Sequence, residues 1–269
     1  MDSASLWRLI VLLLAAVDVA RCRFHAYARG WQLATATWYG SPSGAGTDGG
    51  ACGYGELPNT PYGLDVGAGS PVLFKNGRGC GACYKNSCSS FLAWIAQVRC
   101  LQQQLCSGKA VTVVITDECP GGYCAFGRTH FDLSGTAFGR MAMAGRTNQL
   151  LGSGVMQVLY KRVDCNYGSR PMEFQVNEGS TPFWLSILVR YAAGPGDLGH
   201  VELMQAGSRV WQPMTQVWGA TWCFNGGPLR GPFSFRVTTL STSETVVARN
   251  VIPRNWASNT CYRSRVNFR

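Results

Sequence analysis

Short apolar runs, separated by turns that contain glycine and proline, fill the first half of the chain. The run 111–116 is almost continuously apolar, a pattern typical of a strand that is buried on both faces. Three other runs are shorter or alternate between apolar and polar residues, and each predicts a strand: 34–39, 71–74 and 155–163. Residues 136–144 predict a short helix that ends at Gly145.

The second half has a more regular pattern of short apolar runs with turn signals between them. Seven strands are predicted there: 174–176, 184–191, 200–204, 210–213, 221–224, 233–238 and 246–251. This spacing favours an immunoglobulin-like β-sandwich, and the change of pattern places a domain boundary near residues 166–171. The chain is therefore expected to be all-β and to form two domains.

The alternation within run 184–191 also predicts which side chains face outward. Leu185, Ile187, Val189 and Tyr191 form a uniformly apolar face that is expected to point into the core. Trp184 belongs to the opposite face and is therefore expected to face solvent. No comparable pattern places Trp218.

The N-terminus has the layout of a secretory signal. One basic residue, Arg8, precedes the apolar run 9–17, and small residues follow at Ala15, Ala16 and Ala20. We expect residues 1–22 to be removed, with the cut after Ala20 or after Cys22. No later stretch approaches the ~20 apolar residues of a membrane span, so no transmembrane segment is expected and the mature chain is expected to be soluble.

Twelve cysteines in a chain of 269 residues predict a disulfide framework if the protein is secreted. Nine of them lie between Cys52 and Cys165, which suggests that the first domain is the more strongly cross-linked one. Cys80 and Cys83 have a spacing that zinc sites also use, but the chain has no second such pair with histidines and contains only three histidines. No metal and no organic cofactor is therefore expected.

Composition and charge narrow the possible partners. Hydrophobic residues make up 46% of the chain and charged residues only 14%, which excludes an intrinsically disordered protein. The formal net charge is +10, but the basic residues form no clustered run, so a nucleic-acid partner is not expected. The positive charge is compatible with acidic matrix polysaccharides, or with a role in solubility alone.

Three aspartates lie next to turns or strand ends in the first half: Asp48, Asp117 and Asp132. Two carboxyl groups on either side of a sugar linkage can hydrolyse it, one as acid and the other as base or nucleophile. Each aspartate also has a structural interpretation. Asp48 and Asp117 are suited to turns, and Asp132 is suited to capping a helix that starts at Leu133.

Blocks of sequence throughout the chain resemble the β-expansins, the family that includes the group-1 grass pollen allergens. The blocks in the first half are TWYG (37–40), GGACGYG (49–55), GCGACY (79–84), VVITDECP (113–120) and HFDLSG (130–135). Those in the second half are NEGS (177–180), VWGA (217–220), GPFSF (231–235) and VIPRNW (251–256). The resemblance covers essentially the whole mature chain.

This resemblance implies a six-stranded double-psi β-barrel for residues 23–168, similar to family-45 glycoside hydrolases. It implies a β-sandwich carbohydrate-binding module for residues 169–269. By position, five residues of the first domain are expected to line an open groove that binds polysaccharide: Thr37, Tyr39, Asp48, Asp117 and Asp132. Trp184 and Trp218 are expected to bind sugar rings on the second domain.

The resemblance also implies a function without hydrolysis. Asp132 corresponds to the general acid of the hydrolases, but the place of their catalytic base reads Gly40-Ser41-Pro42 and holds no carboxylate. A lone acid cannot activate the attacking water. We therefore expect a secreted, monomeric cell-wall protein that loosens non-covalent adhesion between cellulose and matrix glycans such as glucuronoarabinoxylan.

Two alternatives remain open. The first is a hydrolase of wall β-glucan or xylan with Asp132 as general acid and Asp48 as base. The second is a structural wall protein that only binds carbohydrate.

The resemblance further implies three disulfides, Cys52–Cys80, Cys83–Cys165 and Cys88–Cys106. Residues 91–104 look like an insertion relative to the family and contain Cys100. Cys119 and Cys124 are close enough to bridge one turn, and Cys223 and Cys261 can pair only if their strands adjoin.

Overall fold

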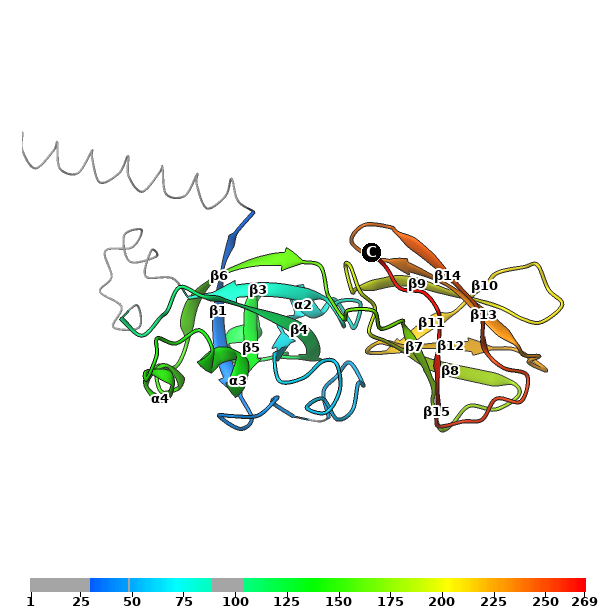
Figure 1. The fold of residues 1–269 in the computed structure, drawn as a ribbon, viewed down its shortest axis with the longest axis horizontal. Helices are drawn as coiled ribbons and strands as arrows, with labels where there is room; N and C mark the ends of the chain where they lie inside the picture. Colours follow the sequence, from blue (N-terminus) through cyan, green and yellow to red (C-terminus); the bar gives the residue numbers. More distant parts are fainter. Residues whose placement is uncertain (1–29, 48, 89–103) are drawn as a thin grey trace, which may run out of the picture.

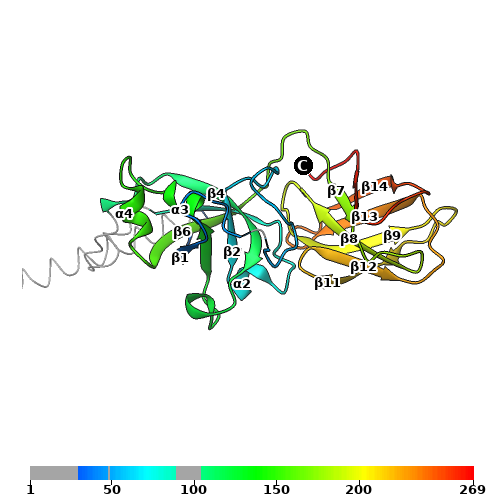
Figure 2. The same cartoon turned by 90° about the horizontal axis from the view of Figure 1, so that it is seen from below.

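The computed structural model describes residues 30–47, 49–88 and 104–269, which form two β-domains side by side along the longest axis (Figure 1). A view from below shows the same two bodies without overlap (Figure 2). The first is a closed barrel and the second consists of two sheets. The all-β, two-domain expectation is confirmed.

Six strands close the first domain into a barrel in the order β1-β5-β2-β4-β3-β6. Their bounds are β1 Gln32–Tyr39, β2 Val66–Gly69, β3 Cys83–Ser87, β4 Ala110–Glu118, β5 His130–Ser134 and β6 Met156–Val163. β1 runs parallel to β5 and β2 runs parallel to β4, whereas the other neighbours are antiparallel. This is the six-stranded barrel that the resemblance implies.

Residues 71–74, predicted as a strand, instead form the short helix α2 (Pro71–Phe74). Proline suits the first turn of a helix because its missing N–H would have no partner there. Lys75 ends the helix with a positive φ of 53°. Leu73 and Phe74 are buried, so the apolar run reflects a buried helical turn that packs on the barrel.

The helix expected over 136–144 is shorter and starts earlier, as α3 (Gly135–Gly139). The Ser134 hydroxyl accepts a hydrogen bond from the Ala137 N–H at 3.0 Å, so Ser134 is the N-cap and the capping role considered for Asp132 is wrong. Asp132 is the central residue of β5, between the fully buried Phe131 and Leu133. Two further short helices are η3 (Gly122–Cys124) and α4 (Thr147–Leu151).

The second domain is a sandwich of two sheets with strand orders β10-β9-β13-β14 and β11-β12-β8-β7-β15. Its strands are β7 Glu173–Val176, β8 Trp184–Arg190, β9 Leu198–Met204, β10 Gln212–Pro213, β11 Thr215–Trp218, β12 Thr221–Asn225, β13 Phe233–Thr239, β14 Thr245–Ile252 and β15 Thr260–Arg263. The seven predicted runs all coincide with strands. β11 and β15 were not predicted.

Strand β8 shows the alternation that its sequence predicts, apart from its end. Leu185, Ile187 and Val189 are buried in the core of the sandwich, and Trp184 lies on the opposite face. Tyr191, expected to point into the same core, follows the strand with a positive φ of 59° and packs into the barrel's apolar cluster instead. Side chains of residues 184–191 therefore pack into two hydrophobic cores, that of the sandwich and that of the barrel.

The two domains share one apolar interior at their junction. Leu188, Tyr191 and Ala220 of the sandwich belong to the same buried cluster as the barrel core. The ring centroids of Tyr62 and Tyr191 are 4.8 Å apart, and the Tyr62 hydroxyl accepts a hydrogen bond from the Tyr191 N–H at 3.1 Å. The Ala220 N–H donates to the Cys52 carbonyl, also at 3.1 Å. These contacts hold the domains in one relative orientation.

An ion pair also crosses the junction. Arg162 of β6 lies with Nη2 3.1 Å from Oδ2 of Asp197, whose side chain is fully buried. Arg162 also donates to the Tyr84 hydroxyl at 3.0 Å and to the Pro195 carbonyl. A buried ion pair needs such additional hydrogen bonds to offset desolvation, and its geometry fixes the two partners against each other.

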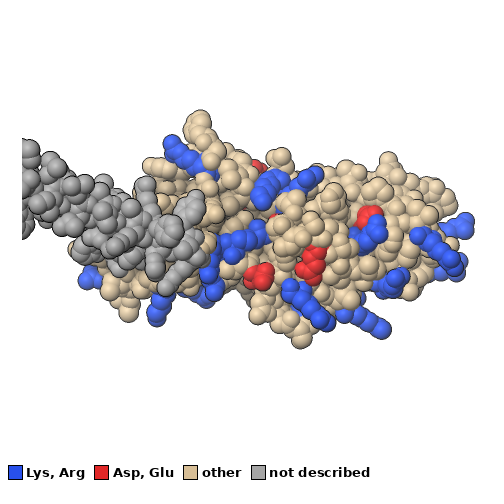
Figure 3. Space-filling model, turned by 90° about the horizontal axis from the view of Figure 1, so that it is seen from above, with Lys and Arg blue, Asp and Glu red and all other residues tan. Residues whose placement is uncertain are grey.

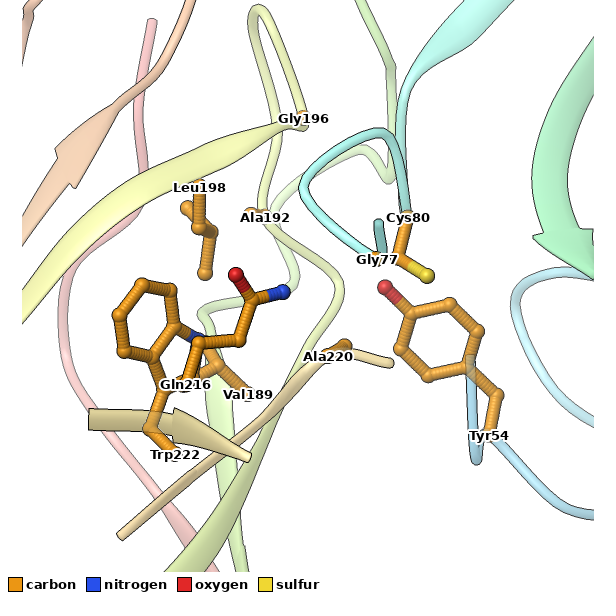
Figure 4. A pocket seen from close by; sticks show the side chains of 10 residues that line it. All are labelled: Tyr54, Gly77, Cys80, Val189, Ala192, Gly196, Leu198, Gln216, Ala220 and Trp222. Carbon is orange, nitrogen blue, oxygen red and sulfur yellow. The ribbon is translucent and has the colours of Figure 1, made fainter. Parts of the chain in front are cut away.

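The junction encloses a small cavity between Tyr54, Gln216 and Trp222 (Figure 4). Its volume is about 10 Å³. A cavity of this size accommodates at most about one water molecule. It is therefore too small to hold a sugar.

Four disulfides are formed by the described residues: Cys52–Cys80, Cys83–Cys165, Cys88–Cys106 and Cys119–Cys124. The first three have the pairing that the resemblance implies, and the fourth bridges one turn. Cys22 and Cys100 lie outside the described residues, as does most of the insertion at 91–104.

Cys223 and Cys261 are both unpaired, because the condition for a disulfide between them, adjoining strands, is not met. They lie on β12 and β15 of one sheet, with β8 and β7 between these strands. Neighbouring strands are about 4.8 Å apart, so three strand spacings exceed the Cα separation that a disulfide allows. Within the part of the chain that the structure describes, no helix has the length and apolar character needed to cross a membrane.

Candidate functional site

Four neighbouring barrel strands each contribute one residue to a row that runs across the sheet, perpendicular to the strands. Thr37 on β1 pairs with Asp132 on β5, Asp132 pairs with Ala68 on β2, and Ala68 pairs with Asp117 on β4. Directly paired residues project from the same face of a sheet, and neighbouring strands are about 4.8 Å apart. The two aspartates therefore face the same way across the small Ala68. We call the following residues the polar cluster: Thr37, Tyr39, Asp117, His130 and Asp132.

A chain of hydrogen bonds links the buried His130 to Asp132. The Thr37 hydroxyl donates to Oδ1 of Asp132 at 2.6 Å and lies 2.9 Å from Nε2 of His130. Nδ1 of the same ring lies 2.7 Å from the Thr35 hydroxyl. Since Thr37 gives its proton to the carboxylate, its oxygen accepts from Nε2–H, and Nδ1 accepts from Thr35.

Burial keeps His130 neutral. Its side chain is inaccessible to solvent, and this desolvation lowers its pKa to about 4. A neutral imidazole with one donor and one acceptor nitrogen satisfies both threonines, so His130 orients Thr37 and, through it, Asp132. The sequence drew attention to the block that contains His130, but no pattern indicated that the ring itself supports the site.

Asp132 is half-buried, and its environment favours the protonated form. The pKa of its carboxyl group is raised, chiefly by burial and further by the negative charge of Asp117, while the hydrogen bond from Thr37 opposes the rise. The folded protein therefore holds this proton more tightly than the unfolded chain does.

This pKa shift predicts how Asp132→Asn changes stability. The stabilising effect of protonating Asp132 is fully present below the ordinary aspartate pKa of 3.8 and is lost as pH rises through the raised value. Asparagine does not ionise, so the variant does not lose stability in this way as pH rises. We therefore expect the variant to become increasingly stable relative to the wild type as pH rises from below 3.8 to neutrality. Urea unfolding of both proteins across this range measures the effect, and a difference that is flat or declines with pH contradicts it.

The glycine-rich segment before Cys52 positions Asp117. Oδ1 of Asp117 accepts hydrogen bonds from the N–H groups of Ala51 at 2.6 Å and Glu118 at 2.8 Å. A Cβ atom on Gly50 would lie 2.6 Å from the carbonyl oxygen of Thr116, so only glycine allows this approach. One oxygen of Asp117 is thus fixed by the backbone.

Tyr39 packs beside both aspartates under the same segment. A Cβ atom on Gly46, which has a φ of 90°, would lie 2.3 Å from Cζ of the Tyr39 ring. Burial raises the pKa of the Tyr39 hydroxyl, and the charges of Asp117 and Asp132 raise it further, so the group stays protonated and can act as a donor. Asp48, the fifth residue expected in the groove, lies outside the described residues.

The two tryptophans proposed for sugar binding occupy one face of the five-stranded sheet. Trp184 of β8 pairs with Asn225 and Trp218 of β11 pairs with Thr221, and these two partners are the last and first residues of β12. The tryptophans therefore lie beside opposite ends of β12 and project from the outer face of the sheet. Trp218 is 57% exposed, whereas Trp184 is partly buried.

The Trp218 ring lies against the barrel domain. A Cβ atom on Gly53 would approach this ring to 2.6 Å. Since Gly53 follows Ala51 by only two residues, Trp218 lies on the Asp117 side of the polar cluster. No group of three or more potential metal-ligating side chains occurs among residues 30–47, 49–88 and 104–269.

Comparison with known proteins gives matches over most of the chain. Residues 172–253 match the Expansin C-terminal domain, and residues 66–160 match the double-psi barrel family described as lytic transglycolase. Expansin-B16 of Oryza sativa subsp. japonica is 56% identical over 239 residues, which cover 88% of this chain and 84% of the rice protein. Expansin-B3 of Arabidopsis thaliana is 51% identical over 266 residues, which cover 98% and 96%.

Solved structures show the same architecture. The expansin of Clavibacter michiganensis superposes with a TM-score of 0.64 at 22% identity, covering 89% of this chain and 98% of the bacterial one. A point variant of that bacterial protein was solved in complex with cellohexaose. At this level of sequence identity, the comparison shows a shared fold.

Proposed function

The chain belongs to the expansin-B family, and from this membership we propose that it loosens plant cell walls without cutting their polysaccharides. In this proposal the signal at 1–22 directs export, residues 23–168 form the barrel domain, and residues 169–269 form the carbohydrate-binding domain. The mature protein acts as a monomer in the wall, and its partners are cellulose and matrix glycans such as glucuronoarabinoxylan.

The row formed by Thr37, Asp132 and Asp117 supports binding of a sugar chain. The free acceptor positions of the two carboxyl groups suit sugar hydroxyls, and Tyr39, whose hydroxyl is buried, contributes the accessible part of its ring. Asp48 joins them in the proposal on the basis of the family pattern. Trp184 and Trp218 extend the contact to the second domain, where pyranose faces stack on their rings.

The observation that carries the non-hydrolytic proposal is the segment Gly40–Pro42. It has no carboxylate, and its backbone packs on α3, where a Cβ atom on Gly135 would lie 2.3 Å from the Ser41 carbonyl oxygen. In the family-45 hydrolases this place supplies the base. Without it, Asp132 can supply an acid, but no partner from this segment activates water.

Loosening then follows from competition. Neighbouring glycan chains adhere through many weak hydrogen bonds and stacking contacts. A protein that occupies one face of a chain removes those contacts and shifts the adhesion equilibrium by its differential affinity.

The charge distribution supports acidic matrix glycans as partners. Lysine and arginine side chains lie scattered over both domains on the face seen from above, and they outnumber the acidic ones there (Figure 3). Scattered positive charge attracts a polyanion without forming a single deep site.

One experiment separates this proposal from its alternatives. Purified mature protein is applied to heat-inactivated wall strips under constant load while extension and released reducing ends are measured together. We expect extension and no sugar release. Reducing ends that accumulate from purified polymers and are lost with Asp132→Asn identify a hydrolase that uses Asp132, whose raised pKa suits a general acid. Binding to walls without extension identifies a purely structural protein.

A further inference from the structure

The loop between β4 and β5, residues 119–129, carries two exposed aromatic side chains. Phe126 is 90% exposed and Tyr123 is 55% exposed. Exposed apolar side chains that gather in one place, rather than singly, are typical of interaction sites. These two lie three residues apart in one loop.

The backbone at Phe126 is also unfavourable. Phe126 and Gly127 have consecutive positive φ angles of 64° and 71° in a two-residue turn. Glycine or asparagine adopts this conformation readily, whereas a bulky side chain incurs a cost of about 1–2 kcal/mol. Phe126 thus stabilises neither its turn nor the core, and such residues often serve a ligand.

The structure fixes this loop beside the polar cluster. It starts two residues after Asp117, and the disulfide Cys119–Cys124 closes its first turn. The Tyr123 ring stacks on His130 with centroids 6.2 Å apart and an interplanar angle of 19°. His130 in turn contacts Thr37, which donates to Asp132.

The loop and Trp218 contact the polar cluster through different residues. Trp218 reaches the cluster through the segment that holds Asp117, whereas Tyr123 reaches it through His130. Two exposed aromatic side chains, Trp218 and Tyr123, therefore lie beside the polar cluster.

We propose that Tyr123 and Phe126 form an additional aromatic subsite for a β-linked glycan chain that continues from the carboxyl groups of the polar cluster over the loop between β4 and β5. The subsite rests on the proposed function, because its ligand is the chain that the polar cluster binds. The rings stack on pyranose faces, and Tyr123 adds a hydroxyl for polar contact.

The test measures binding of cellotriose and cellohexaose by calorimetry to the mature protein. Phe126→Asn removes the ring and supplies a residue that tolerates positive φ, so this variant is expected to be no less stable than the wild type. Tyr123→Leu keeps an apolar cover over His130 but removes the flat ring. Val210→Asn, at a 66% exposed residue of the second domain, is the matched control.

We expect each loop variant to weaken hexaose binding about threefold to tenfold, and the double variant to weaken it further. Triose binding and the Val210→Asn control are expected to match the wild type. Unchanged hexaose binding by the double variant overturns the subsite while leaving the proposed function intact, and so does an equal loss for both ligands. A wild-type protein that binds neither oligosaccharide overturns the proposed function itself.

Discussion

Asp132→Asn is expected to reduce wall extension to the level of a buffer control. The amide oxygen can still accept the hydrogen bond from the Thr37 hydroxyl, so the orientation of the side chain is retained. The second carboxyl oxygen becomes an NH₂ group that cannot accept a sugar hydroxyl. A hydrogen bond to a charged group contributes about 1.5–3 kcal/mol, so occupancy should fall at least about tenfold.

Two controls assign that loss to the site. Asp164→Asn makes the same chemical change at an exposed residue of the same domain and should extend walls normally. Thermal unfolding should show Asp132→Asn to be no less stable than the wild type near neutral pH, because the variant lacks a half-buried carboxylate. Full extension by Asp132→Asn would show that this carboxyl group is dispensable for loosening.

Removing the disulfide Cys83–Cys165 is expected to have the largest effect on stability. It closes a loop of 82 residues and ties β3 to the chain just after β6. The loop-entropy relation gives a loss of about 4.5 kcal/mol for a loop of this length. We therefore expect the Cys83→Ala/Cys165→Ala variant to lose a large part of its unfolding free energy, measured by urea titration.

The disulfide Cys119–Cys124 provides the comparison. It spans only five residues, for which the same relation gives about 2 kcal/mol. The Cys119→Ala/Cys124→Ala variant should therefore lose less than half as much stability. If the two double variants are equally destabilised, loop length does not govern the effect.

The strands that the sequence revealed are those with clear apolar runs. β4 is a continuous apolar run, and β8 alternates, so both were predicted close to their observed bounds. β2 reads VGAG, β3 reads CYKNS and β5 reads HFDLS. These strands are short and contain small or polar residues. Pairing with the neighbouring barrel strands, rather than their own sequence pattern, decides their conformation.

The candidate site could be predicted in composition but not in arrangement. The family resemblance brought Thr37, Asp117 and Asp132 together, and the strand pairing places them in one row. Neither pattern nor resemblance indicated the support by His130 or the exposed ring of Phe126. Both depend on which strands become neighbours, and that information is distributed along the whole chain.

The shared interior of the two domains has a mechanical consequence. Because Leu188, Tyr191 and Ala220 pack into the barrel's own apolar cluster, and Arg162 forms an ion pair with the buried Asp197, a change in the angle between the domains would have to break these contacts. The distance between the row that contains Asp132 and Asp117 and the sheet face that carries Trp184 and Trp218 is therefore fixed before a ligand binds. Under the proposed function, a glycan chain that binds both surfaces is therefore held at two points whose separation does not change.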